Sequence, residues 1–195
     1  MAYALATLAA IAWLDAPLAR WLATFEKPAI AHDVIHVLEY ATLVEPTKWL
    51  LLAVFTAATL AVAFVPRLHR WFPQVTYVVL VALLTRNLTL WCKGATGRLR
   101  PLEWLHDGGA DTFFRHGIAF PSGHVTIFAS LAIPIALVCP RAWPVLAIVP
   151  TAMIARLAVD AHFASDTLGG VALVCFVAWA CGPLITRSQQ PGDGG

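Results

Sequence analysis

Long apolar stretches, each close to the length that a helix needs to cross a bilayer, constrain the fold of this chain most strongly. Five of them are Lys48–Val65, Gln74–Cys92, Gly123–Cys139, Trp143–Val159 and Thr167–Ile185. A helix crosses about 30 Å of hydrocarbon in roughly 20 residues. Only 12% of the 195 residues are charged, whereas a soluble domain carries about 25%. The sequence therefore predicts an all-α, polytopic membrane protein.

A sixth apolar stretch, Met1–Leu14, has only about two-thirds of the length that a span needs. It is compatible with a short span, a tilted span, or a span whose start has been cut back. A cleaved signal peptide is disfavoured because the stretch contains no Lys or Arg. We expect about six transmembrane helices in a bundle that forms a single membrane-embedded domain over residues 1–187. Residues 188–195 are expected to be a flexible C-terminal tail.

Basic residues in the connecting segments predict the orientation of the bundle. If six spans are counted from an N-terminus inside the cell, one side of the membrane receives Arg67, Arg70, Arg141 and Arg187. Positively charged connections favour the cytoplasmic side. The opposite side nevertheless also carries basic residues, which are Lys93, Arg98, Arg100 and Arg115. These outer charges run against the trend, so we expect them to have another purpose.

Three polar clusters lie at span ends on this outer side. They are Lys93–Pro101, Phe120–His124 and Arg156–Asp166. Fixed cations at a bilayer edge are costly without partners. A phosphate dianion would suit a lysine and two arginines, because planar guanidinium groups bind its oxygens in pairs. The clusters therefore indicate a phosphate site.

The second cluster reads as the start of a helix. Ser122 is a favourable cap residue, and Gly123 allows the backbone to approach a ligand closely. The amides of the first helical turn would face an anion. His124 lies in that same turn, within reach of the anion.

The third cluster pairs a histidine with a carboxylate. His162 and Asp166 are four residues apart, which places them on one face of a helical turn. A carboxylate that accepts one imidazole N–H leaves the other nitrogen available as a nucleophile. Arg156 is six residues before His162, so the two cannot share a face of an unbroken helix. The sequence therefore predicts a break near Asp160–Ala161.

In their order and spacing, the three clusters resemble the signature of the type 2 phosphatidic acid phosphatase superfamily. Six residues separate Lys93 from Arg100-Pro101, and Pro121-Ser122-Gly123-His124 follows. Five residues then separate Arg156 from His162, and three separate His162 from Asp166. The family usually has Ser before the third-cluster arginine, where this chain has Ala155. That difference puts one phosphate hydrogen bond in doubt, and not the reaction.

The resemblance implies a specific role for each of these residues. His162 would attack phosphorus, Asp166 would orient it, and His124 would protonate the leaving lipid oxygen. The residues expected to hold the phosphate oxygens are Lys93, Arg100, Arg156, Ser122 and Gly123. Arg98 and Arg86 are expected to support the site. No metal and no cofactor is implied, because the cations stabilise the charge that builds in the transition state.

Each cluster alone also has a purely structural explanation. Lys93–Pro101 would suit a basic loop on lipid headgroups, and Pro121–His124 an ordinary capped helix start. Asp166 alone would suit the N-cap of the last span. Only the joint occurrence of all three, in order and on one membrane face, favours catalysis. For Arg86, seven residues before Lys93 and thus on the same helix face, substrate contact and support of the site remain equal alternatives.

His32 and His36 have a spacing that can bind a metal, but no third ligand set accompanies them, so an interfacial face is favoured. The small net charge of +2 gives no reason to expect nucleic acid as a partner. The expected partners are a phosphorylated lipid substrate and the lipid bilayer, and no required protein partner is evident.

The resemblance implies a lipid phosphatase of the inner cell membrane, with its active site on the extracytoplasmic (periplasmic) face. Candidate substrates are phosphatidylglycerophosphate, undecaprenyl pyrophosphate, phosphatidate and lipid A. Alternative functions are a lipid phosphotransferase with the same phosphohistidine, and a non-catalytic lipid-binding or transport protein. A vanadium haloperoxidase, which is soluble, is excluded by the apolar composition.

Overall fold

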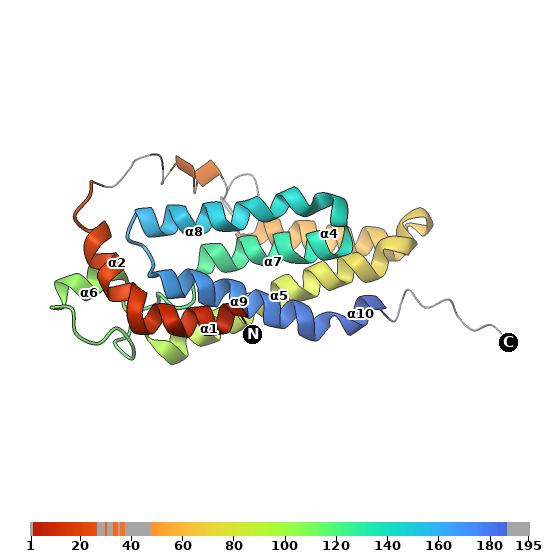
Figure 1. The fold of residues 1–195 in the computed structure, drawn as a ribbon. Coiled ribbons are helices and arrows are strands. Elements are labelled where there is room, and N and C mark those ends of the chain that lie inside the picture. The colour runs from red at the N-terminus through yellow and green to blue at the C-terminus, as the bar shows by residue number, and fades with distance from the viewer. Residues whose placement is uncertain (1, 27–29, 31–32, 35, 38–47, 187–195) are drawn as a thin grey trace.

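The computed structural model describes residues 2–26, 30, 33–34, 36–37 and 48–186, and this part of the chain is helical without any strand (Figure 1). Its N-terminal elements are α1 (Ala2–Ala9), the π-helical segment η1 (Ala10–Leu14) and α2 (Asp15–Leu22). The others are α4 (Lys48–Phe64), η2 (Pro66–Trp71), α5 (Phe72–Thr96), α6 (Pro101–His106), α7 (Gly123–Val138), η3 (Pro140–Ala147), α8 (Ile148–Ala158), α9 (Ala164–Cys181) and α10 (Pro183–Thr186). The all-α prediction is confirmed.

The helices have the length and composition of membrane spans. Four helical segments are long and apolar enough to cross a bilayer, namely Ala2–Leu22, Pro66–His106, Pro140–Ala158 and Ala164–Cys181. Two shorter apolar helices, Ala53–Phe64 and Gly123–Val138, accompany them. The described part of the chain therefore agrees with the predicted polytopic membrane bundle.

The first helix is longer than the sequence predicted, since the predicted apolar stretch ended at Leu14. The chain instead remains helical from Ala2 to Leu22 through α1, η1 and α2. Asp15 is buried within this helix, with a side-chain exposure of 4%. A buried carboxylate is costly unless it is paired, and Asp15 is paired with Arg98. Arg98, the partner that allows Asp15 to be buried, is 83 positions away, so the local sequence did not reveal that the helix continues past Leu14.

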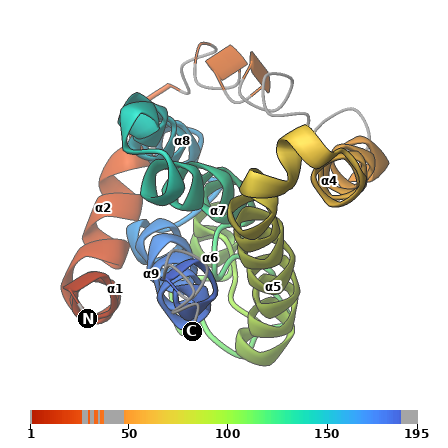
Figure 2. The ribbon, with the colours of Figure 1, turned by 90° about the vertical axis from the view of Figure 1, so that its right-hand side faces the viewer.

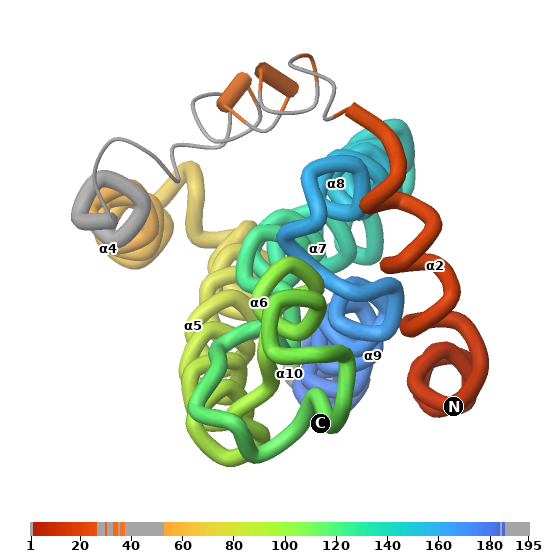
Figure 3. The backbone as a smooth tube through the Cα atoms, turned by 90° about the vertical axis from the view of Figure 1, so that its left-hand side faces the viewer, coloured from red at the N-terminus to blue at the C-terminus, as the bar shows by residue number. Residues whose placement is uncertain are grey.

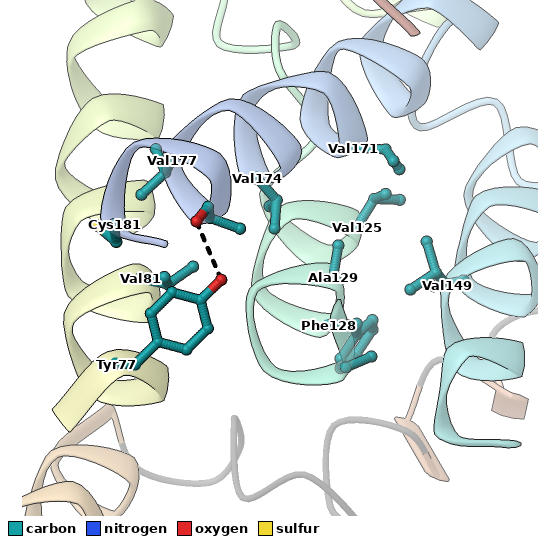
Figure 4. Packing of buried hydrophobic residues seen from close by; sticks show 13 residues of the cluster. Tyr77, Val81, Val125, Phe128, Ala129, Val149, Val171, Val174, Val177 and Cys181 are labelled. Carbon is teal, nitrogen blue, oxygen red and sulfur yellow. Dashed lines mark hydrogen bonds between the residues drawn. The ribbon is translucent and has the colours of Figure 1, made fainter. Parts of the chain in front are cut away.

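Helix α9 lies at the centre of the bundle and contacts α1, α5 and α7, whereas α4 lies at the edge beside α5 and η2 (Figure 2). Valine, alanine and phenylalanine side chains of α5, α7 and α9 form the core, including Val81, Phe128 and Val174 (Figure 4). The one phenol among them, Tyr77, donates to the carbonyl of Ala178 at 3.0 Å. Small core residues let membrane helices pack closely, as they do here.

One end of the bundle brings together the C-terminal ends of α5 and α8 and the N-terminal ends of α7 and α9. Helix α6 and the loop that follows it lie over this end (Figure 3). All three polar clusters of the sequence fall at these helix ends. The fold therefore collects at one end of the bundle residues that are up to 73 positions apart, from Lys93 to Asp166.

Candidate functional site

The first cluster begins where α5 ends. Gly97 adopts a left-handed conformation (φ 52°) at the C-terminus of α5, as a glycine does readily. Its carbonyl accepts the N–H groups of Arg115 and Gly117, and the carbonyl of Arg98 accepts that of Ala119. These bonds fold the loop after α6 back over the cluster. A Cβ on Gly117 would lie only 2.1 Å from the Arg98 carbonyl oxygen, so this close approach requires glycine.

Lys93 meets the start of α7. Its ammonium group donates to the carbonyl of Ile118. A Cβ placed on Gly123 would lie 4.0 Å from the Nζ of Lys93. Among the described residues, Lys93 has no carboxylate oxygen within ion-pair distance. The lysine of the first cluster and the glycine of the second therefore lie side by side.

Ser122 stands at the N-cap position of α7, but its side chain makes no capping hydrogen bond. The predicted side-chain cap is therefore wrong. The hydroxyl is fully buried, and its Oγ has no hydrogen-bond partner in the described part of the chain. The backbone N–H of Ser122 donates to the carbonyl of Asp166 at 2.9 Å, which joins the second cluster to the third. A buried hydroxyl without a partner is rare in proteins, so this hydroxyl is available to bond a ligand or a water molecule.

The third cluster contains the predicted helix break. Helix α8 ends at Ala158, Asp160 takes a positive φ of 49°, and α9 begins at Ala164. The N–H of Ala161 donates to the carbonyl of Arg156. Arg156 and His162 therefore do not lie on one unbroken helix, because Arg156 is in α8 and His162 is in the turn that follows it.

His162 and Asp166 form the predicted pair. The Nδ1 of His162 lies 3.5 Å from Oδ2 of Asp166, and both side chains are buried, with exposures of 3% and 0%. The same carboxylate oxygen accepts the N–H of Phe163 at 2.8 Å. Phe163, and not Asp166, is therefore the N-cap residue of α9, while Asp166 at the third helical position accepts the N–H of Phe163 and also lies against His162.

The surroundings of His162 favour its neutral form. Burial lowers the pKa of His162, the contact with Asp166 opposes this shift, and the nearby charges of Arg156 and Lys93 lower the pKa further. A neutral imidazole has one nitrogen lone pair available. With the proton on Nδ1 beside the carboxylate, that lone pair is on Nε2.

Arg98 is buried at this end of the bundle and held by several contacts. Its guanidinium donates to Asp166 and to Asp15, each at 2.6 Å, and also to the hydroxyl of Ser165. It lies between the rings of Phe113 and Phe163, at 4.5 and 4.4 Å from their centroids. Two carboxylates already neutralise this arginine, so its contact is with Asp166 and not with the phosphate position.

The remaining predicted residues lie around this centre. Arg100 and Arg156 are within electrostatic range of the Lys93 ammonium. The buried Nε of Arg100 has no hydrogen-bond partner among the described residues. His124, in the first turn of α7, is half-buried, with its ring 6.3 Å from that of Phe128. The exposed Arg86 lines a cavity together with Lys93.

The metal hypothesis concerned His32 and His36. His32 lies outside the described residues. Within the described part of the chain, no group of three or more His, Cys, Asp or Glu side chains is arranged to hold a metal ion. The hypothesis therefore gains no support from this structure.

A sequence profile of the PAP2 superfamily matches residues 74–190, which is more than half of the chain. The chain belongs to the PAP2 superfamily. No curated protein and no solved structure matches it. Superfamily membership identifies the protein as a phosphatase-type enzyme that hydrolyses phosphate esters. The matched region contains all three polar clusters, whereas Asp15 lies before it.

Two residues of this PAP2 protein were missed by sequence reasoning. Asp15 bonds Arg98, and its carboxylate also accepts the backbone N–H of Ser165 at 3.0 Å and the hydroxyl of the same serine. Asp15 and Ser165 are 150 positions apart, and no local spacing connects them. The one available signal was a lone carboxylate at the end of an apolar stretch, since such a group requires a partner.

Proposed function

We propose that this PAP2 protein is an integral-membrane lipid phosphatase that works through a phosphohistidine on His162. The observation that carries the proposal is the buried His162–Asp166 pair beside the cations Lys93 and Arg156. A neutral, oriented imidazole next to positive charge is the arrangement that nucleophilic attack on a phosphate requires.

In the first step, Nε2 of His162 attacks phosphorus and the bond from phosphorus to the lipid oxygen breaks. Asp166 keeps the proton on Nδ1 and stabilises the positive charge that develops on the ring. His124 donates a proton to the leaving oxygen, so the lipid departs as an alcohol. In the second step, water attacks the phosphohistidine, gives its proton to His124 and releases phosphate.

The phosphate oxygens would be held by Lys93, Arg100 and Arg156, together with the Ser122 hydroxyl and the backbone at Gly123. Lys93 and Arg100 have no carboxylate partner among the described residues, whereas Arg98 is saturated by two. The site therefore carries an excess of positive charge that suits a phosphate dianion. These cations perform the charge stabilisation that a metal ion supplies in other phosphatases.

The proposed location is the inner cell membrane, with the active site on the extracytoplasmic face. This orientation places the basic connections Pro66–Trp71 and Pro140–Ala147 on the cytoplasmic side. Labelling of single cysteines introduced next to His124, with a membrane-impermeant reagent on intact cells, tests it. Labelling only after the membrane is permeabilised contradicts the proposed orientation.

The decisive experiment for the function is phosphate release by the purified protein from a panel of lipids: phosphatidate, phosphatidylglycerophosphate, undecaprenyl mono- and pyrophosphate, lipid A and sphingoid phosphates. We expect release from at least one lipid, inhibition by vanadate and no inhibition by EDTA. Transfer of the phosphate to a labelled acceptor without release would instead establish a phosphotransferase. Full cellular function of a His162→Ala variant would establish a non-catalytic protein.

A further inference from the structure

A cavity with a mainly apolar surface and two cationic side chains extends from the proposed phosphate site along the interface of α5 and α7. It has a volume of about 210 Å³. Its lining residues on α5 are Arg86, Thr89, Leu90 and Lys93, and those on α7 are Gly123, Thr126, Ile127 and Ser130. On each helix these residues recur at spacings of three, four and seven, so each helix contributes one face. The cavity begins at Lys93 and Gly123 and runs along both helices away from the active-site end.

Arg86 lies inside a segment long and apolar enough to span the membrane, ten residues before the end of α5. A charged side chain at such a depth is costly unless it is paired or faces a polar path. Among the described residues, Arg86 has neither a carboxylate within ion-pair distance nor a hydrogen bond. It is exposed and lines the cavity. Within the part of the chain that the structure describes, the charge of Arg86 therefore has no protein partner.

The other polar side chains of the cavity do not neutralise Arg86. The hydroxyls of Thr89, Thr126 and Ser130 donate to carbonyls of their own helices, at 2.8, 2.6 and 2.8 Å. None of the described residues that line the cavity is acidic. The cavity thus has a cation at each end, Lys93 and Arg86, and requires negative charge from a ligand at both.

The spacing of the two cations restricts the ligand. Seven residues of helix separate Arg86 from Lys93, which is about 10 Å along the axis at ~1.5 Å per residue. The two phosphates of a pyrophosphate share one oxygen, so both would remain beside Lys93. A phosphodiester separated from a terminal phosphate by a short polyol would reach deeper, toward Arg86.

We propose that Arg86 forms a second anion subsite, which binds the inner phosphodiester of a glycerophospholipid while the terminal phosphate of its headgroup binds at Lys93. This inference rests on the proposed phosphatase function and names the substrate class of that site. It places the lipid with its terminal phosphate at the active-site end and its diester deeper in the bilayer, in the order in which such a lipid inserts into a membrane.

The test compares two substrates in detergent micelles, phosphatidylglycerophosphate with two phosphates and phosphatidate with one. We expect Arg86→Gln to raise KM for phosphatidylglycerophosphate by about tenfold or more, because a charge-assisted hydrogen bond to the diester is lost. KM for phosphatidate should be unchanged. Arg86→Lys should restore part of the affinity because the positive charge is kept. Arg67→Gln, the same substitution on the exposed segment η2, is the matched control and should change neither KM.

Equal losses for both lipids would overturn the subsite, since Arg86 would then support the phosphate site or the helix packing in general. Unchanged KM values for both lipids would also overturn it. Failure of the wild-type protein to release phosphate from any lipid of the panel contradicts the proposed function itself. That last outcome is measured with the wild-type protein alone. Failure of the proposed function can therefore be distinguished from failure of the proposed subsite, which is measured with the Arg86 variants.

Discussion

Arg98 binds Asp15 of the N-terminal helix with one guanidinium nitrogen while another binds Asp166, the residue against His162. All three side chains are almost completely buried, with exposures of 1%, 4% and 0%. The first helix of the chain is therefore connected through one arginine to the carboxylate that orients the proposed nucleophile. The described hydrogen bonds of Asp15 go to Arg98 and Ser165 and to none of the proposed phosphate-binding residues, so we expect Asp15 to act as a positioning residue.

The first prediction concerns the charge of Asp15. Asp15→Asn leaves Arg98 with one carboxylate instead of two, and removing a partner from a buried ion pair costs about 3–5 kcal/mol. We expect a lower temperature of thermal unfolding in detergent and a fall in kcat of at least about tenfold. KM should change little, because the phosphate contacts remain. Steady-state phosphate release and thermal unfolding of the purified variant measure these effects.

The matched control for Asp15→Asn is Asp107→Asn. Asp107 also pairs with an arginine, Arg115, but both side chains are about two-fifths exposed, at 42% and 41%. Exposed pairs contribute about 0–1 kcal/mol, so this variant should behave as the wild type. Wild-type kcat in the Asp15→Asn variant would show that the buried network does not position Asp166.

The second prediction concerns pH. Burial and the charges of Arg156 and Lys93 lower the pKa of His162 despite Asp166. His162 must be neutral to attack, so kcat/KM should be retained down to pH values below about 6.5, the ordinary histidine pKa, and be lost only as pH falls further. The Asp166 carboxylate raises the pKa of His162, so Asp166→Asn should lower that pKa. The acid limb should then move to lower pH, while kcat falls.

A pH profile of kcat/KM for both proteins measures this effect. An acid limb of the wild type well above pH 6.5 would contradict the assignment of that limb to His162. A shift of the acid limb to higher pH in Asp166→Asn would also contradict this assignment.

The third prediction concerns the space beside Lys93. A Cβ on Gly123 would make ordinary contacts of 3.8 and 4.0 Å with the Lys93 side chain, so Gly123→Ala should fold normally. The methyl group would occupy space at the proposed phosphate position, and we expect KM to rise by about tenfold or more. Gly94→Ala is the control, because a Cβ there meets nothing within 4 Å. Equal kinetics of the two variants would place the phosphate elsewhere.

The fourth prediction concerns the buried hydroxyl of Ser122. Because its Oγ has no hydrogen-bond partner among the described residues, Ser122→Ala breaks no described hydrogen bond. We expect stability to be unchanged or slightly higher and kcat/KM to fall by about tenfold, the usual value of one hydrogen bond to a charged group. Thermal unfolding and phosphate release distinguish the effects. Unchanged kcat/KM would remove Ser122 from the phosphate site.

The sequence predicted well those features that depend on local spacing. Three features follow from residues within ten positions of one another. They are the helix break before His162, the contact of His162 with Asp166, and the position of Arg86 and Lys93 on one helix face that lines the cavity. The proximity of Lys93 to Gly123 is not local in sequence, and the resemblance implied only that both residues hold the same phosphate.

The features that sequence reasoning missed depend on distant partners. The helix through Asp15 and the burial of Arg98 result from one ion pair between residues 83 positions apart. The serine hydroxyl of the second cluster was assigned as a cap from its residue type, but its backbone bond to Asp166 and its burial leave the hydroxyl without a capping bond. Neither outcome is encoded in a local pattern.

The central claim is that phosphate becomes attached to His162 during turnover. Rapid acid-free quenching of the enzyme with ³²P-labelled lipid, followed by peptide mass spectrometry, tests it most directly. We predict an acid-labile, base-stable phosphate on the peptide that contains His162 in the wild-type enzyme, and its absence in His162→Ala. Steady turnover with no labelled protein, or label that persists in the His162→Ala variant, would contradict it.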